Sequence, residues 1–246
     1  MIAGKFLWFK PVVNLIEKIN NHRYFYEVTK YENDTPRLVN LKGLIKRGPE
    51  DTIQLRSGRV VEKCKIFQEY FSDLKKIDFE TDISRVERYQ EINIKEGFFW
   101  ISHESFIFLV STGNKDILIN RLSKAIFLNN EDKIHTVEID LESLEQNYQR
   151  LWHSTIRRRD QQNTQGITIT SGSYYGNDIK NDIEQGVIIN SKVKNSIGIE
   201  PRIDNRNVMV KITRNGSINF PALSEIDSKL ILEFLERVIL PLTTFI

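Results

Sequence analysis

Apolar residues alternate with polar ones in several segments, which is the spacing of a half-buried strand. Tyr24, Tyr26 and Val28 follow this pattern, and a second apolar run at residues 38–44 comes after the turn-forming residues 33–36. The two runs predict a hairpin. Before it, residues 5–9 (KFLWF) predict a buried strand, and Pro11 suits the first turn of a helix that continues to about residue 19.

Other segments show helical spacing. Val60, Cys64, Phe67, Phe71 and Leu74 recur at intervals of three and four residues, so we expect a helix with Cys64 on its apolar side. Residues 78–96 are dense in charge and only weakly periodic. They fit either a connector or a pair of exposed edge strands.

Another helix is expected after Asp140, a residue type that caps helix N-termini. The apolar positions that follow are Leu141, Leu144, Tyr148, Leu151, Trp152 and Ile156, and they predict a helix over residues 140–159. Residues 160–207 are rich in Gly, Ser, Asn and Gln. We expect loops there, with short strands at residues 167–170, 187–189 and 197–199 and an exposed loop at residues 172–178.

Two units share the order strand, turn, strand, helix. The first has strands at 98–101 and 106–110 and a helix after Asn114; the second has strands around Val210 and at 218–220 and a helix from Ser224 to Pro241. The predicted fold class is α+β, with antiparallel sheets, helices packed on one face and two hairpin-plus-helix halves. The halves would be residues 1–130 and 131–246, with one continuous domain as the alternative and chance similarity favoured over duplication.

Composition indicates a folded chain. Of 246 residues, 40% are hydrophobic and 28% charged, close to the globular average. Cys64 is the only cysteine, which excludes an internal disulfide and a zinc site built on paired cysteines. We expect a cytoplasmic protein without a signal peptide and without membrane contact, because no apolar stretch approaches the roughly 20 residues that a spanning helix needs.

Basic and acidic residues nearly balance, at 35 and 33, so binding to nucleic acid would need a local patch. Arg150, Ser154 and Arg157 follow helical spacing on the helix predicted after Asp140, and Arg158 and Arg159 extend the charge. Arginine suits bidentate phosphate contacts. Lys211 and Arg214 of the C-terminal hairpin add to a basic sheet face. The alternative is a solvated face whose cations complement the helix dipole.

Signals for catalysis are thin. The chain has no phosphate-binding glycine loop, dinucleotide fingerprint or serine-hydrolase elbow, and its four histidines show no metal-binding spacing. Asp160, Asp178 and Lys180 have the crude form of a metal-dependent nuclease signature. Cys64 lies on an apolar stripe without a charged partner in the sequence pattern. We expect no catalytic residue, no metal site and no cofactor.

These patterns favour a non-catalytic nucleic-acid-binding module that contacts DNA or RNA through the arginine patch. We expect it to be a subunit of a larger complex with another protein chain. One alternative is a protein-interaction scaffold, whose apolar patch would lie at residues 98–100 or 240–246. The other is a divergent metal-dependent nuclease.

Overall fold

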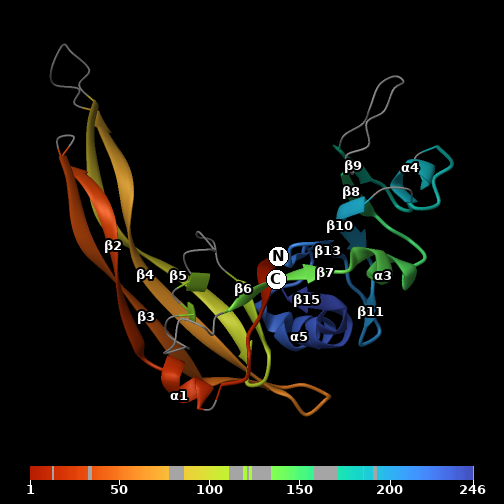
Figure 1. The fold of residues 1–246 in the computed structure, drawn as a ribbon, viewed down its shortest axis with the longest axis horizontal. Helices are drawn as coiled ribbons and strands as arrows, with labels where there is room; N and C mark the ends of the chain where they lie inside the picture. The colour runs from red at the N-terminus through yellow and green to blue at the C-terminus, as the bar shows by residue number, and fades with distance from the viewer. Residues whose placement is uncertain are drawn as a thin grey trace.

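One antiparallel sheet organises the chain (Figure 1). The computed structural model describes residues 1–12, 14–32, 35–77, 86–110, 119–120, 122–123, 134–157, 171–184, 186–190 and 193–245. Within these residues thirteen strands pair, and eleven of them follow the order β2-β3-β4-β5-β6-β1-β14-β13-β10-β8-β9. The remaining two, β7 and β15, pair with each other, and β7 also pairs with β1. β11 and β12 form a separate hairpin.

The strands are β1 (Ile2–Trp8), β2 (His22–Glu32), β3 (Thr35–Gln54), β4 (Val60–Ile77), β5 (Val86–Ser102), β6 (Phe106–Val110), β7 (His135–Ile139), β8 (His153–Arg157), β9 (Ser171–Tyr175), β10 (Val193–Ile199), β11 (Arg202–Ile203), β12 (Arg206–Asn207), β13 (Val210–Thr213), β14 (Ser217–Phe220) and β15 (Thr243–Phe245).

The helices are short. They are α1 (Leu15–Ile19), α3 (Leu141–Gln146), α4 (Gly186–Asn190) and α5 (Ser228–Phe234), with η1 (Glu225–Asp227) before α5 and η2 (Leu235–Ile239) and η3 (Leu240–Leu242) after it. The predicted α+β class is therefore wrong, since the chain is mostly β and its helices are too short to form a layer on one face. Among the described residues, no helix is long and apolar enough to cross a membrane.

The helix predicted from Val60 to Leu74 is wrong, because these residues belong to β4. β4 pairs with β3 on one side and with β5 on the other. Side chains alternate between the two faces of a strand, so the helical spacing divides: Cys64 lies on one face, and Phe67 and Phe71 lie on the other. Both faces of β4 carry apolar side chains, and taken together these residues recur at the intervals of three and four that are typical of a helix.

The helix predicted over residues 140–159 is also wrong beyond its first turns. Asp140 does cap α3, accepting a hydrogen bond from the Ser143 backbone N–H at 3.0 Å. α3 nevertheless ends at Gln146, and residues from His153 onward form β8, which lies between β10 and β9. A strand with neighbours on both sides satisfies its backbone groups across the sheet, and this outweighs the helical spacing of the apolar residues.

Two smaller predictions fail in the same region. The strand expected at residues 187–189 lies in α4, and most of the loop expected at residues 172–178 is β9. The strand expected at 167–170 lies outside the described residues, as does most of the helix expected after Asn114. The strand at 197–199 is confirmed as part of β10.

Other predictions are confirmed. The strand at residues 5–9 lies largely in β1, α1 follows Pro11, and β2 pairs with β3 as the expected hairpin. Of residues 78–96, for which a connector and a pair of edge strands were both open, residues 86–96 belong to β5, which pairs with β4, and residues 78–85 lie outside the described residues. In the C-terminal unit β13 pairs with β14, and Ser224 and Asp227 form a capping box before α5. The two proposed halves share the sheet, because β1 pairs with β6 and with β14; their independence stays a prediction.

The sheet has two faces, which we name by the helices that pack on them. On the α1 face, Leu15 and Ile19 of α1 join a buried core with Ile45, Cys64 and Ile66. On the α5 face, a second core gathers residues of α5 with strand residues that include Phe6, Trp100, Ile212, Ile218 and Phe220. The strands nearest β1 are covered on both faces. Farther out, each half of the sheet is covered on one face only, and on opposite faces.

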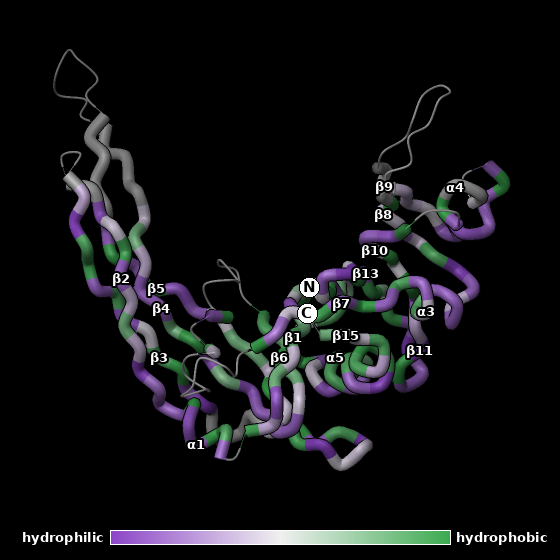
Figure 2. Tube along the Cα trace, in the orientation of Figure 1, coloured by the Kyte–Doolittle hydropathy of each residue, from purple (hydrophilic) through white to green (hydrophobic). Residues whose placement is uncertain are grey.

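The strands β2, β3, β4 and β5 extend from the body as a long arm, seen at the left of Figure 1. Hydrophobic and hydrophilic positions alternate along these strands (Figure 2). Pairing between β3 and β4 ends at Gly43–Gln68. Beyond this point β2 and β3 form one prong, and β4 and β5 form another. The arm is therefore forked.

Two neighbouring residues of β4 point to opposite faces of the arm, so substituting each of them tests which face is covered. Ile66 is 2% exposed within the α1-face core, whereas Lys65 points to the opposite face and is paired with Glu96. We expect Ile66→Ala to lower the free energy of unfolding by about 2–5 kcal/mol. Lys65→Ala should cost less than about 1 kcal/mol, because its ion pair is exposed. Chemical denaturation of both variants checks this, and equal losses would contradict the strand assignment.

Candidate nucleic-acid interface

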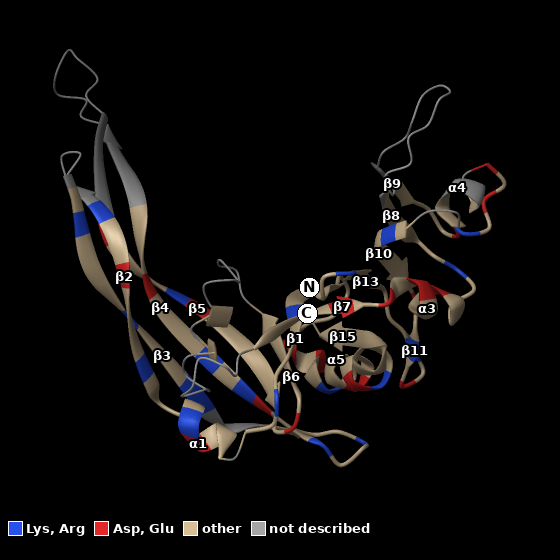
Figure 3. Ribbon diagram, in the orientation of Figure 1, with Lys and Arg blue, Asp and Glu red and all other residues tan. Residues whose placement is uncertain are grey.

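Six neighbouring strands of the sheet contain no acidic residue. They are β1, β14, β13, β10, β8 and β9, whose sequences are IAGKFLW, SINF, VKIT, VKNSIGI, HSTIR and SGSYY. In Figure 3 the red of Asp and Glu appears beside them, on β7 and α3. Because acidic residues nearly equal basic ones in the whole chain, this run of strands differs clearly from the average.

The α1 face of these strands is polar, and we call it the polar face. Register places on it Lys5, Ser217, Asn219, Lys211, Thr213, Gly198, Ser196, His153, Thr155, Ser173 and Tyr175. The alternate residues of the same strands, such as Ile197, Val210, Ile212 and Ile218, are buried on the α5 face. One face thus holds the strands in the core, and the other offers hydroxyl, amide, ammonium and aromatic groups.

His153 lies at the centre of the polar face and is fully buried. Its Nε2 lies 3.0 Å from Ser196 Oγ and 3.2 Å from Thr155 Oγ1. Thr155 Oγ1 in turn lies 3.2 Å from Ser173 Oγ. This row of hydroxyl groups crosses β10, β8 and β9 and fixes the imidazole ring in the surface of the sheet.

The environment keeps the His153 ring neutral. Burial lowers the pKa of His153 from 6.5 to about 4, and the positive charge of Lys211 lowers it further, while the backbone carbonyl of Tyr174 acts in the opposite direction. A charged imidazolium would lose its hydration in this position. At neutral pH the buried His153 ring is therefore uncharged.

Aromatic rings lie on both sides of His153. The Trp152 and His153 ring centroids are 5.7 Å apart, and those of His153 and Tyr175 are 4.5 Å apart. Trp152 is held by a 3.0 Å hydrogen bond from its Nε1 to the Ile199 carbonyl. Its ring also needs Gly198, where a Cβ atom would come within 2.5 Å of the Trp152 ring. Tyr175 is 66% exposed, and Lys211 Nζ lies 6.0 Å from its ring centroid.

The arginine patch expected on one helical face does not have that geometry. Arg150 precedes β8 and Arg157 ends it, so an extended strand of roughly 13 Å separates them. The Arg150 side chain is 80% exposed, with its Nε 4.0 Å from Asp178 Oδ2. Arg158 and Arg159 lie outside the described residues. Of the predicted cations, Lys211 lies on the polar face, and Arg157 lies on the strand that crosses it.

Arg214 is engaged elsewhere. Its guanidinium donates to Glu142 Oε2 at 2.6 Å and to Glu138 Oε1 at 3.4 Å, and its Nε donates to the Lys194 carbonyl at 3.0 Å. These contacts join the turn after β13 to α3, β7 and β10. A phosphate at Arg214 would have to compete with two carboxylates, so we assign it a structural role.

The residues of the nuclease hypothesis do not meet as a metal site. Asp160 lies outside the described residues. Asp178 accepts a hydrogen bond from Asn181, and the Lys180 ammonium donates to the backbone carbonyls of Glu145 and Tyr148. In the part of the chain that the structure describes, no cluster of three His, Cys, Asp or Glu residues could hold a metal ion.

In the sequence, this interface is marked by polar-face residues at every second position, but apolar residues at helical spacing overlap with them. In His153-Ser-Thr155-Ile-Arg157 the polar-face residues alternate with others, but Leu151, Trp152 and Ile156 also fit a helix. Tyr175 falls in the exposed loop predicted at residues 172–178, and His153 has no second histidine at metal-binding spacing to mark it. Comparison with protein-family models, curated proteins and solved structures found no match, so the interface is defined by its geometry alone.

The neutral state of His153 predicts a pH dependence of stability. The unfolded state takes up a proton near pH 6.5 and the native state only near pH 4, so the free energy of unfolding should fall as pH drops through this window. The full effect is on the order of 2–4 kcal/mol. Denaturation at pH 7 and pH 4.5 measures it.

In a His153→Gln variant the same pH change should cost markedly less. His22, whose pKa burial also lowers, provides the control: His22→Gln should retain most of the wild-type slope. Equal slopes in the wild type and His153→Gln would show that His153 does not stay neutral.

Proposed function

We propose that the chain is a non-catalytic module that binds single-stranded nucleic acid on its polar face. The observation that supports it is the run of six strands without a carboxylate, with Tyr175 exposed beside Lys211. A phosphate backbone is repelled by carboxylates and attracted by lysine and arginine. A surface that lacks carboxylates and contains lysine and arginine therefore suits a phosphate backbone.

The aromatic row suits unpaired bases. Proteins that bind single strands combine cationic grooves with aromatic side chains, and stacking of one base contributes about 1–3 kcal/mol. Tyr175 offers one ring face to solvent, and Trp152 and His153 support it from within the sheet. Hydroxyl groups of Thr155 and Ser173 lie beside these rings and can bond to sugar or phosphate oxygens. Bases within a duplex do not expose their faces for such stacking.

The wider expectations remain part of the same proposal. The ligand can be DNA or RNA, the chain acts as a subunit with another protein, and its location is cytoplasmic, in keeping with the buried thiol of Cys64. The nuclease alternative has no supporting geometry among the described residues. The scaffold alternative concerns other surfaces, at residues 98–100 or 240–246, where Phe99 and Trp100 are buried and Phe245 is half exposed.

Binding of labelled single-stranded oligonucleotides tests the proposal. Tyr175→Ala should weaken binding by about 1–3 kcal/mol through lost stacking, whereas Tyr175→Phe should bind nearly as the wild type does. Lys211→Gln should reduce the slope of log affinity against log salt by about one unit. Fluorescence anisotropy at two salt concentrations measures both effects.

Matched controls lie on the arm. Tyr70 is 38% exposed and Lys46 is exposed, so Tyr70→Ala and Lys46→Gln remove the same residue types far from the polar face. These variants should bind as the wild type does. The proposal fails if the wild type binds no oligonucleotide at low salt, or if the arm variants lose as much affinity as the polar-face variants.

A further inference from the structure

The arm carries a second surface that the polar face does not explain. On β2, β3, β4 and β5 the α1 face is partly covered by α1. The opposite face is buried where Val61 and Trp100 join the α5-face core, and it is open farther out along the arm. We call this open side the arm face. Register places Phe25, Leu44, Phe67 and Ile94 on it. Their alternate neighbours, including Tyr24, Ile45, Ile66 and Cys64, point to the covered face.

Large apolar side chains are exposed on the arm face. Phe25 is 70% exposed, Leu38 71%, Ile94 70% and Ile92 51%. Single exposed apolar residues are common, but a contiguous group on one face marks a surface that another molecule covers. Of the apolar patches expected at residues 98–100 and 240–246, the first is largely closed, because Phe99 and Trp100 are fully buried, whereas Phe245 in the second stacks on Trp8 and is 50% exposed.

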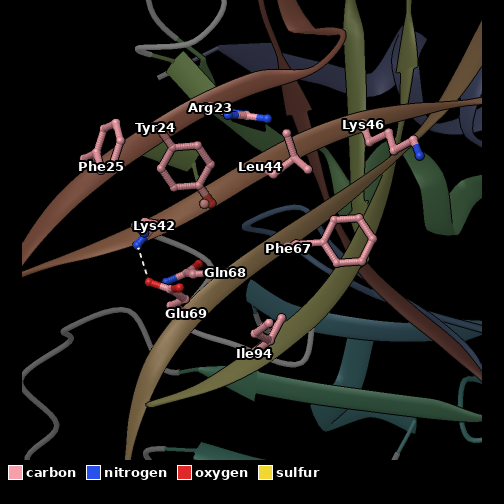
Figure 4. A pocket seen from close by; sticks show the side chains of 11 residues that line it. Arg23, Tyr24, Phe25, Lys42, Leu44, Lys46, Phe67, Gln68, Glu69 and Ile94 are labelled. Atoms are coloured by element: carbon pink, nitrogen blue, oxygen red, sulfur yellow. Dashed lines mark hydrogen bonds between the residues drawn. The ribbon is translucent and has the colours of Figure 1, made fainter.

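Phe25 and Ile94, together with Leu44 and Phe67, line a groove of about 650 Å³ (Figure 4). It lies where pairing between β3 and β4 stops at Gly43–Gln68. Two hydrogen bonds join the prongs at the point where they separate. The Glu69 carboxylate accepts a hydrogen bond from the Lys42 backbone N–H at 2.8 Å, and the Tyr26 hydroxyl donates to the Glu69 backbone carbonyl. The groove is therefore a built feature of the fork, with a floor of Leu44 and Phe67.

Strand edges adjoin the groove. The Lys42 N–H points toward β4, and backbone groups alternate sides along a strand, so Leu38 and Asn40 direct theirs the same way. In this stretch β3 has no paired residue on β4. An extended segment can use such an edge while its side chains enter the groove.

The charge of the groove indicates which class of molecule it binds. Arg23, Lys42 and Lys46 line it, against one carboxylate, that of Glu69. Among the described residues, none of these three cations has an ion-pair partner. A second copy of this chain would set one cationic groove against another in a two-fold dimer, which like charges oppose. The groove contains the rings of Tyr24, Phe25 and Phe67, but the exposed side chains of Leu38, Ile92 and Ile94 on the same face are aliphatic and favour apolar peptide side chains over bases.

We propose that the groove of the arm face binds an extended segment of another protein, with apolar side chains flanked by Asp or Glu. The apolar residues cover Phe25, Leu44, Phe67 and Ile94, and the carboxylates pair with Arg23 and Lys46. This surface lies on the opposite face of the sheet from the polar face, so the two sites can be occupied together. It also supplies the partner contact that a subunit of a larger complex needs.

Selection from a displayed library of random peptides on the immobilised full-length chain tests the proposal, since it requires no known partner. Recovered peptides should be enriched in apolar residues alternating with or flanked by Asp and Glu. A selected peptide, synthesised with a fluorophore, should bind the double variant Phe25→Ser, Ile94→Ser at least about tenfold more weakly than the wild type. Arg23→Glu with Lys46→Glu should weaken it similarly and favour peptides with Lys or Arg.

The matched control is the double variant Ile183→Ser, Ile226→Ser, which removes apolar residues that are 94% and 96% exposed outside the arm. Its peptide affinity should equal that of the wild type. No enrichment, enrichment of basic peptides, or binding that the arm variants do not change would overturn the proposal. A dimer in sedimentation experiments that Phe25→Ser, Ile94→Ser abolishes would identify a second copy as the occupant and overturn it as well. Oligonucleotide binding by these variants should remain intact, which separates this result from the polar face.

Discussion

The structure depends on the burial of one continuous sheet on opposite faces in its two halves. α1 covers the first half from one side, and α5 covers the second half from the other. Only the strands around β1 are covered on both sides. β1 is the first strand in the sequence but a central one in the sheet, where it pairs with β6 and β14. Apolar burial around this strand holds the halves together.

This arrangement leaves two open faces with different chemistry. The polar face is open because α5 and its core lie behind it, and its alternate positions carry Lys, Ser, Thr, His and Tyr. The arm face is open because α1 lies on the other side, and its alternate positions are largely apolar. Strand alternation produces both surfaces from the same sheet. A chain with one covered face throughout would have a single open surface of mixed character.

Sequence patterns predicted the elements whose alternation is simple. The hairpin of β2 and β3, the strands at Phe98 and Phe106 and the C-terminal unit are confirmed. The pattern failed where both faces of a strand carry apolar residues, as in β4, or where one apolar residue follows three or four positions after another, as from Tyr148 to Ile156. In those segments the period of two and the helical period overlap. The neighbours that decide between them lie far away in the sequence.

The candidate interface was predictable in part. The alternation of Lys211 with Val210 and Ile212 predicts a position on a basic sheet face, and the structure puts Lys211 beside Tyr175. The contribution of β9 and of His153 depends on pairing between β8, β9 and β10, which no local pattern reveals. The groove of the arm depends on where β3 and β4 separate. Register of this kind follows from packing across strands and not from any single segment.

Photo-crosslinking of a single-stranded oligonucleotide that carries a reactive base, followed by mass spectrometry of the crosslinked peptides, shows where the strand lies on the sheet. Crosslinks are expected in β8, β9 and β13, centred on Tyr175, with the arm unmodified. Crosslinks concentrated on β2 to β5, or absent from the polar face while the oligonucleotide is bound, would contradict binding on the polar face.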